Sequence, residues 1–80
     1  MTFLNIGFGN LVSSERIISI LTPDSSPMKR LVRLGKTKNS LIDASCGRKT
    51  QAIIVMDTGH IVLSALTSET LLNKLVKNDN

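Results

Sequence analysis

Apolar residues alternate with polar residues or glycine from Leu4 to Gly9. Leu4, Ile6 and Phe8 are separated by smaller or polar residues, and this period of two predicts a half-buried strand. Gly7 and Gly9 flank the last of these apolar positions. A Gly-x-Gly pair with no third glycine and no following helix is a weak sign of a phosphate-binding loop, so we expect a bulge or tight bend there.

Four later apolar runs predict further strands, at residues 17–21, 41–46, 51–56 and 61–66. The segment from Ala52 to Met56 is apolar at every position, which is typical of a strand buried on both faces. In so short a chain we expect a helix to cover one face and another subunit to complete the other. Residues 57–60 indicate a turn, so the last two runs should pair as a hairpin.

Two helices are predicted from capping residues and apolar spacing. Ser26 suits the N-cap of the first helix, Pro27 its first position, and Asn39 the left-handed residue that ends it. The second helix begins at Thr67 or Ser68. The apolar face of the first helix comprises Met28, Leu31 and Val32, and that of the second Leu71, Leu72, Leu75 and Val76.

These elements predict a single α+β domain over residues 1–80, with a mainly antiparallel sheet of about five strands, two helices and a tail that frays at 78–80. A domain of 80 residues has a marginal core. Cys46 and His60 are the only cysteine and histidine, so the chain offers neither an internal disulfide nor a set of metal ligands. Self-association is the remaining support for the fold.

Catalytic, cofactor-binding and metal-binding residues are not predicted. His60 lies in a turn with no nucleophile or orienting acid at a recognisable spacing, and Cys46 has no second cysteine to resolve an oxidised form. No apolar run has the length of a membrane span, and the N-terminus lacks the features of a signal peptide. We therefore expect a cytoplasmic protein that is not an enzyme, with no membrane partner and no small-molecule substrate.

Positive charge is concentrated in the middle of the chain. The net charge is +4, but the segment from Arg16 to Lys49 holds eight cations against two carboxylates, a net of +6. Such a basic region is expected of a protein that binds a phosphate backbone, although a solvated basic helix gives the same count. Only Phe3 and Phe8 are aromatic, which argues against the stacking platforms of single-strand binders.

The loop from Cys46 to Thr50 is the strongest candidate site. Gly47 lets the backbone approach an anion, Arg48 offers a bidentate fork, Lys49 adds a point charge and Thr50 a hydroxyl. A basic hairpin loop facing solvent is the alternative interpretation. Arg16, at the start of a strand, is either a rigidly placed cation or an edge-strand charge that discourages aggregation. Secondary candidates on the first helix are Lys29, Arg30 and Arg33.

Short motifs along nearly the whole chain resemble those of one bacterial family. They are Asn5-Ile6-Gly7-Phe8-Gly9-Asn10, Glu15-Arg16-Ile17-Ile18-Ser19-Ile20, Ser26-Pro27-Met28-Lys29-Arg30, Leu41-Ile42-Asp43-Ala44, Gly47-Arg48-Lys49-Thr50, Ile54-Val55-Met56-Asp57 and Leu63-Ser64-Ala65. In this combination the chain resembles the RemA family of extracellular-matrix regulatory proteins.

That resemblance implies a DNA-binding transcriptional regulator that assembles into a closed ring, an octamer in the family, with a subunit similar to the LytTR DNA-binding domain. Duplex DNA would follow the outside of the ring. The implicated basic residues match Arg16, Arg48 and Lys49. Lys49 stands where the family commonly has arginine, so it keeps the charge but loses the planar fork. An RNA-binding module and a structural oligomer without nucleic acid are the alternatives.

Overall fold

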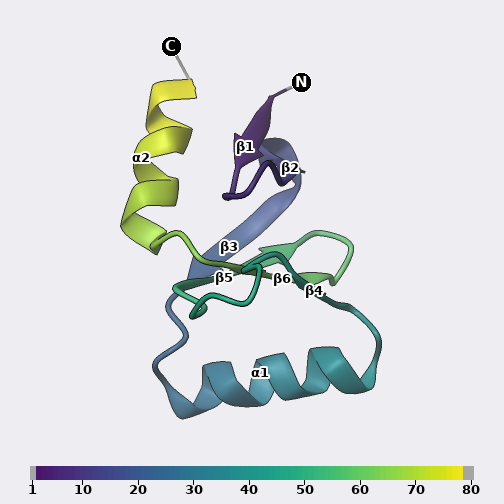
Figure 1. Cartoon of the computed structure of the whole chain (residues 1–80). Coiled ribbons are helices and arrows are strands. Elements are labelled where there is room, and N and C mark those ends of the chain that lie inside the picture. Colours follow the sequence, from purple (N-terminus) through teal and green to yellow (C-terminus); the bar gives the residue numbers. More distant parts are fainter. Residues whose placement is uncertain (1, 79–80) are drawn as a thin grey trace.

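Two helices and two sheets form three layers in the computed structural model of the protein, which describes residues 2–78 (Figure 1). In chain order the elements are β1 (Phe3–Asn5), β2 (Leu11–Ser13), the 3-10 helix η1 (Ser14–Arg16), β3 (Ile17–Leu21), α1 (Ser26–Thr37), β4 (Leu41–Asp43), β5 (Ala52–Met56), β6 (Ile61–Ser64) and α2 (Ser68–Asn78). The predicted α+β class is confirmed. Ring assembly and a likeness to the LytTR domain stay predictions.

The main sheet has four strands in the order β3-β5-β6-β4. The predicted hairpin of β5 and β6 is confirmed, and β3 pairs with β5 antiparallel, but β4 pairs with β6 in parallel. Strand β4 ends at Asp43, so the predicted strand 41–46 is too long. The basic loop is not a hairpin, because β6 lies between β4 and β5 in the sheet. The chain instead passes over the end of β6, where the Ala44 N–H donates to the Leu63 carbonyl (2.9 Å) and the Gln51 N–H to the Ser64 carbonyl (2.8 Å).

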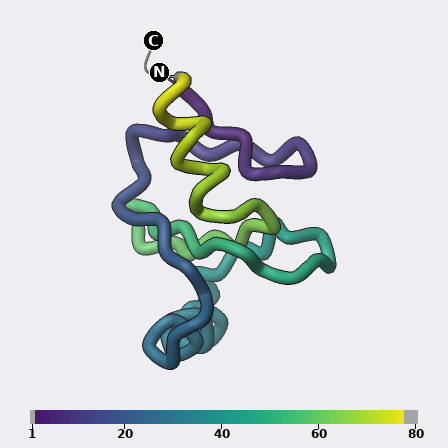
Figure 2. Tube along the Cα trace, turned by 90° about the vertical axis from the view of Figure 1, so that its left-hand side faces the viewer, coloured from purple at the N-terminus to yellow at the C-terminus, as the bar shows by residue number. Residues whose placement is uncertain are grey.

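Strand β5 is buried on both faces, as predicted, with Ala52, Ile53 and Ile54 fully buried. The expectation that a second subunit covers one face is wrong, because the chain covers both. On one face α1 packs with its predicted apolar residues against Ile53, and on the other the hairpin β1–β2 and α2 pack against Ile54. Figure 2 shows α1 on one side of the main sheet and the hairpin with α2 on the other.

The first predicted strand is shorter than its alternation suggested. Leu4 and Ile6 are buried, but Phe8 lies in the turn after β1 and is 54% exposed. The predicted bend is confirmed, with positive φ at Gly7 (107°) and Gly9 (77°). The chain then returns as β2, which pairs antiparallel with β1. Phe8 departs from the predicted period of two because a turn, unlike a strand, does not alternate its side chains between two faces.

The ends of α1 follow local signals. Its N-cap is Ser25, whose hydroxyl accepts from the Met28 N–H (3.4 Å), so the predicted cap at Ser26 is wrong by one residue. Asn39 adopts φ 55°, as expected for the left-handed residue after a helix. Gly35 is buried, and a Cβ there would come 3.3 Å from Ile61 Cδ1, so glycine allows α1 to approach the sheet closely.

Helix α2 is capped as predicted but divides its apolar residues between two directions. Thr67 Oγ1 accepts from the Thr70 N–H (3.2 Å). Leu71 and Leu75 pack in the core, whereas Leu72 and Val76 are 57% and 60% exposed, so only half of the predicted apolar face is buried within the chain. The helix extends to Asn78, so the prediction that the frayed tail begins at this residue is wrong, and the expected fraying of residues 79 and 80 lies outside the described residues.

Candidate nucleic-acid interface

The basic loop is held by a tight turn whose base is buried. Its central residues, Cys46 and Gly47, have φ of 54° and 80°, and the turn is closed by the Arg48 N–H donating to the Ser45 carbonyl (3.0 Å). Positive φ at both central positions defines a type I′ turn, which glycine adopts without strain. Because Ala44 and Ser45 are buried, the turn projects from a fixed base.

Asp43 fixes the approach to this turn. Its Oδ1 accepts from the Ser45 hydroxyl (2.5 Å) and from the Ser45 N–H (3.0 Å). These two hydrogen bonds, with a smaller contribution from the charge of Lys36, hold the pKa of Asp43 below its ordinary value, while burial opposes them. The ionised carboxylate therefore helps to order the segment from which Arg48 and Lys49 project.

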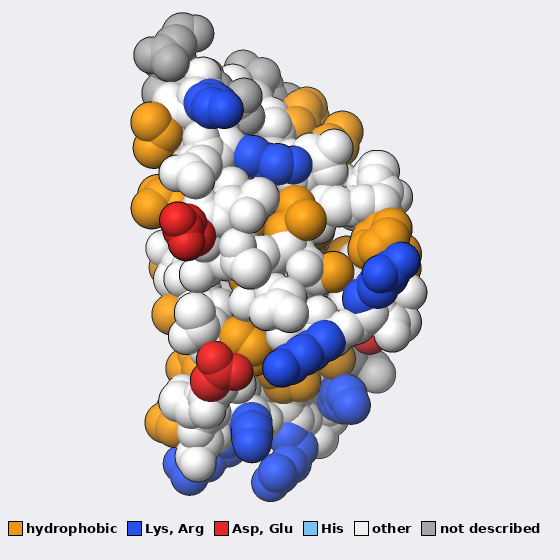
Figure 3. Space-filling view, turned by 60° about the vertical axis from the view of Figure 1, so that its left-hand side comes forward, with side chains coloured by type: hydrophobic (Ala, Val, Ile, Leu, Met, Phe, Trp, Pro, Cys, Tyr) orange, Lys and Arg blue, Asp and Glu red, His pale blue; other side chains and the backbone are white. Residues whose placement is uncertain are grey.

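Arg48 and Lys49 are both exposed beside an open hollow of about 380 Å³. The hollow is lined by Phe8, Arg48, Lys49, Gln51, Ala65 and Leu66. Within residues 2–78 neither cation forms an ion pair with a carboxylate. Figure 3 shows Lys and Arg side chains gathered over the lower part and right-hand edge of one face, with hydrophobic side chains along its left-hand edge.

Phe8 is the residue of this surface that the sequence analysis missed. Its ring lies 5.9 Å from the Arg48 guanidinium carbon, at the outer limit of a cation–π contact. The period of two predicted a strand position for Phe8. The two flanking glycines were the available signal, because they place the side chain between them in a turn rather than in a strand.

A buried serine sets the position of the hairpin relative to the loop. Ser64 is fully buried, and its hydroxyl donates to the Ile6 carbonyl (2.8 Å) while it accepts from the Leu66 N–H (3.0 Å). The Ser64 carbonyl accepts from the Gln51 N–H at the end of the basic loop. Gly7 lies against the side chain of Leu66. The turn that carries Phe8 and the turn that carries Arg48 thus share one anchor.

Arg16 lies at the opposite end of the main sheet. Its carbonyl accepts from the Asp57 N–H (2.8 Å), and its Nη1 lies 3.2 Å from Asp57 Oδ2. Because Asp57 follows β5 and the basic loop precedes it, Arg16 and Arg48 lie beyond opposite ends of that strand, which is roughly 13 Å long at about 3.3 Å per residue. The three predicted contact residues do not form one cluster within a chain.

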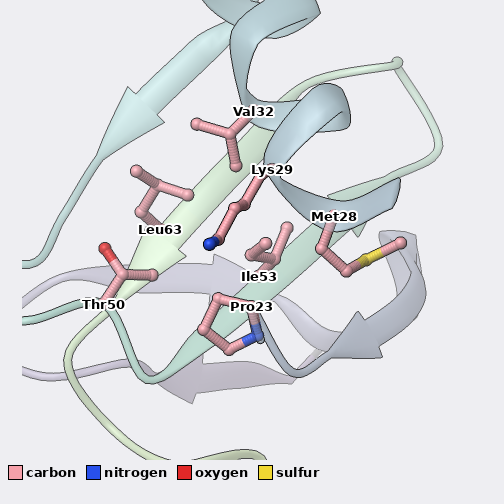
Figure 4. Close-up of a pocket in the computed structure, with 7 residues that line it drawn as sticks. All are labelled: Pro23, Met28, Lys29, Val32, Thr50, Ile53 and Leu63. Atoms are coloured by element: carbon pink, nitrogen blue, oxygen red, sulfur yellow. The ribbon is translucent and has the colours of Figure 1, made fainter. Parts of the chain in front are cut away.

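Thr50 and Lys29 face a different hollow, between α1 and the main sheet (Figure 4). This hollow of about 220 Å³ is mostly apolar, and the two side chains extend toward it from opposite sides. Thr50 therefore does not join Arg48 and Lys49 around the first hollow. Arg30 and Arg33 are exposed on α1, as the predicted solvated face of a basic helix would be.

The remaining candidate side chains show no arrangement for catalysis or metal binding. His60 Nδ1 lies 2.6 Å from Thr58 Oγ1 in the exposed turn after β5, and Cys46 is a free, exposed thiol. Among the described residues, no three His, Cys, Asp or Glu side chains are grouped so that they could hold a metal ion. In the same part of the chain, neither helix has the length and apolar character needed to span a membrane.

Comparison with known proteins assigns the chain to a family. The model of the RemA-like family, described as extracellular matrix regulatory protein A-like, matches residues 3–75. The chain belongs to the RemA-like family. The resemblance inferred from the short motifs is therefore confirmed, and it extends over both turns and both sheets.

Similar proteins occur in distant bacteria. The chain is 54% identical over 79 residues to a protein of Dictyoglomus turgidum, covering 99% of this chain and 93% of that protein. It is 55% identical over 75 residues to a protein of Bacillus cytotoxicus, covering 94% and 86%. Both relatives carry the provisional name of regulatory protein. Family and relatives indicate a regulatory rather than a catalytic role.

The hydrogen bonds of Asp43 predict a pH-dependent contribution to stability. Because its pKa is lowered in the folded state, the contribution is complete above the ordinary pKa of about 3.9 and is lost as the pH falls through the lowered value. Asp43→Ala should lower the melting temperature by about 2–6 °C at pH 7. The difference from wild type should shrink in melts recorded from pH 4 to pH 2.

Asp24→Ala is the matched control for this experiment, because Asp24 is an exposed aspartate outside the turn. It should leave the melting temperature at pH 7 nearly unchanged. A difference between wild type and Asp43→Ala that stays constant down to pH 2 would contradict the assigned role of the carboxylate.

Proposed function

We propose that this RemA-like protein is a transcriptional regulator that binds duplex DNA through basic surfaces repeated around an oligomeric ring. The observation that supports it most directly is the pair Arg48 and Lys49. Both side chains are exposed on a turn with a buried base, and neither is neutralised by a carboxylate within residues 2–78. Membership of a family of regulatory proteins agrees with such a role.

The chemistry of the loop suits a phosphate backbone. Guanidinium and ammonium groups on adjacent residues can each contact a phosphate oxygen, and such contacts fix a protein on a duplex without reading its sequence. Gly47 is exposed with no Cβ and nothing near that position, so DNA can approach the turn closely. Lys29, Arg30 and Arg33 on α1 extend the positive charge beyond the loop.

Arg16 has a separate place in this proposal. It lies beyond the opposite end of β5 from the basic loop, so within one subunit we expect it to meet another part of the duplex. Its ion pair with Asp57 is exposed on both sides, with 65% and 41% of the side chains accessible. Exposed pairs of this kind are weak, so exchange of the Asp57 carboxylate for a phosphate costs little.

Self-association is supported by apolar side chains that the fold leaves exposed. Leu72 and Val76 lie one turn apart on α2, and Leu72 adjoins Ile20 of β3 around a hollow of about 340 Å³. At the other edge of the sheet, Ile42 of β4 is 49% exposed. We propose that the first surface of one copy meets a different surface of the next, because such head-to-tail contacts form a closed ring when the rotation between neighbours closes, with eight copies in this proposal.

Removal of both loop cations should test the DNA contact. Arg48→Ala with Lys49→Ala should weaken binding to duplex DNA by about tenfold or more at 100 mM salt. It should also flatten the dependence of log K on log salt by roughly 2 for each subunit whose loop contacts the duplex. Fluorescence anisotropy over a salt series measures both quantities.

The matched control is Lys38→Ala with Lys77→Ala, which removes the same charge from two exposed positions outside the loop. Equal weakening by the two double variants would refute a specific role of the loop. Competition with structured RNA separates the RNA-binding alternative, and absence of any binding at low salt would favour the structural oligomer.

The ion pair at Arg16 allows a test by gain of affinity. Asp57→Asn should raise the affinity for duplex DNA by up to about fivefold, because it frees Arg16 for a phosphate, and Arg16→Ala should lower it. Asp24→Asn removes the same charge from an exposed position before α1 and serves as the control in the same anisotropy assay. If Asp24→Asn raised the affinity equally, net charge and not Arg16 would be responsible.

The exposed face of α2 predicts which variants lose assembly. Leu72→Glu with Val76→Glu should convert the oligomer into smaller species, measured as solution mass by light scattering, because it places carboxylates where apolar side chains meet a neighbour. Thr70→Glu with Asn73→Glu adds the same two negative charges to other exposed positions of α2 and should keep the mass. A monomeric wild-type protein, or an unchanged mass for the first variant, would overturn this part of the proposal.

A further inference from the structure

Phe8 occupies a backbone conformation that phenylalanine does not favour. It is a central residue of the turn closed by the Asn10 N–H donating to the Gly7 carbonyl (3.0 Å), with φ 55°. This left-handed region suits glycine and asparagine, whereas a bulky side chain there is strained. The ring is 54% exposed, so burial in the core does not compensate for the strain. The fold alone therefore gives no reason for an aromatic ring at this position.

The surroundings of Phe8 supply a reason. Its ring lies 5.9 Å from the guanidinium carbon of Arg48, and both side chains line the hollow beside the basic loop. The relative position of the two turns is fixed, since the buried Ser64 hydroxyl holds the residue before Gly7 and the Ser64 carbonyl holds Gln51. The turn that carries the ring is thus held in a fixed place beside the long side chain of Arg48.

We propose that Phe8 is a positioning residue of the DNA interface, whose ring holds the Arg48 guanidinium in the orientation that meets a phosphate. The inference rests on the proposed function. An arginine that is free in solution loses rotamer freedom when it binds, and a platform that restricts it beforehand reduces that loss. Cation–π contact allows the ring to do this without neutralising the charge. Phe8 and Arg48 then act as one unit in binding.

Phe8→Asn tests this role because it separates binding from folding. Asparagine tolerates the left-handed conformation, so the melting temperature should stay equal or rise, and the solution mass should not change. The affinity for duplex DNA should fall by about threefold or more, and the salt dependence should shift toward that of Arg48→Ala. Phe8→Tyr keeps an aromatic face and should retain binding within about twofold of wild type.

The coupling with Arg48 is the decisive measurement. In an Arg48→Ala background, Phe8→Asn should have no further effect beyond about twofold, because the group it positions is gone. Phe3→Asn, which removes a phenylalanine of similar exposure (51%) from β1 of the same hairpin, should leave binding intact.

Failure of the inference and failure of the proposed function are distinguishable. If the wild-type protein does not bind duplex DNA, the proposed function is refuted, and the inference is refuted with it. If Arg48→Ala weakens binding while Phe8→Asn leaves it within about twofold, only the role of Phe8 is overturned. An equal loss from Phe8→Asn with and without Arg48 would also overturn it, because the two side chains would then act independently.

Discussion

The hydroxyl of Ser64 joins the N-terminal hairpin to the main sheet. It is fully buried and donates to the carbonyl of Ile6, a residue 58 positions away in the chain, while it accepts from the Leu66 N–H. A buried polar group is stabilising only when it is hydrogen-bonded, so this serine specifies one position of the hairpin over the sheet. That position covers one face of β5 and brings the turn with Phe8 beside the turn with Arg48.

The elements with strong local signals were predictable from the sequence. The uninterrupted apolar run of β5 indicated burial on both faces, and the turn after it indicated the hairpin with β6. Asn39 and Thr67 marked helix boundaries because left-handed backbone and side-chain capping depend on residues close in the chain. The family resemblance came from short motifs that together cover nearly the whole chain.

The remaining features depend on contacts between distant segments, which no local pattern encodes. The basic loop was interpreted as a hairpin because the strands before and after it are close in the chain, yet β4 pairs in parallel with β6. That arrangement leaves the basic loop at one end of the sheet and Arg16 at the other. The apolar residues of α2 form one stripe by spacing, but whether Leu72 faces the core depends on the angle at which the helix lies on the sheet. The hairpin β1–β2 and α2 are also distant from β5 in the chain, so the cover of the second face of β5 was attributed to a neighbouring subunit.

The separation of the cations within one chain has a consequence for the proposed function. A loop that offers two phosphate contacts loses only about a factor of ten in affinity between 50 and 200 mM salt, and its binding is weak at the start. A protein that makes 6–10 such contacts loses a factor of about 10³–10⁵ in affinity over the same range. Such a protein binds tightly at low salt because it neutralises many phosphates at once. On the proposed function, loops from several subunits engage one duplex together, and Arg16 and the cations of α1 add further contacts. The apolar side chains that the core leaves exposed, on α2 and at the sheet edge, provide the surface for that assembly, so on this proposal DNA affinity depends as much on Leu72 and Val76 as on Arg48.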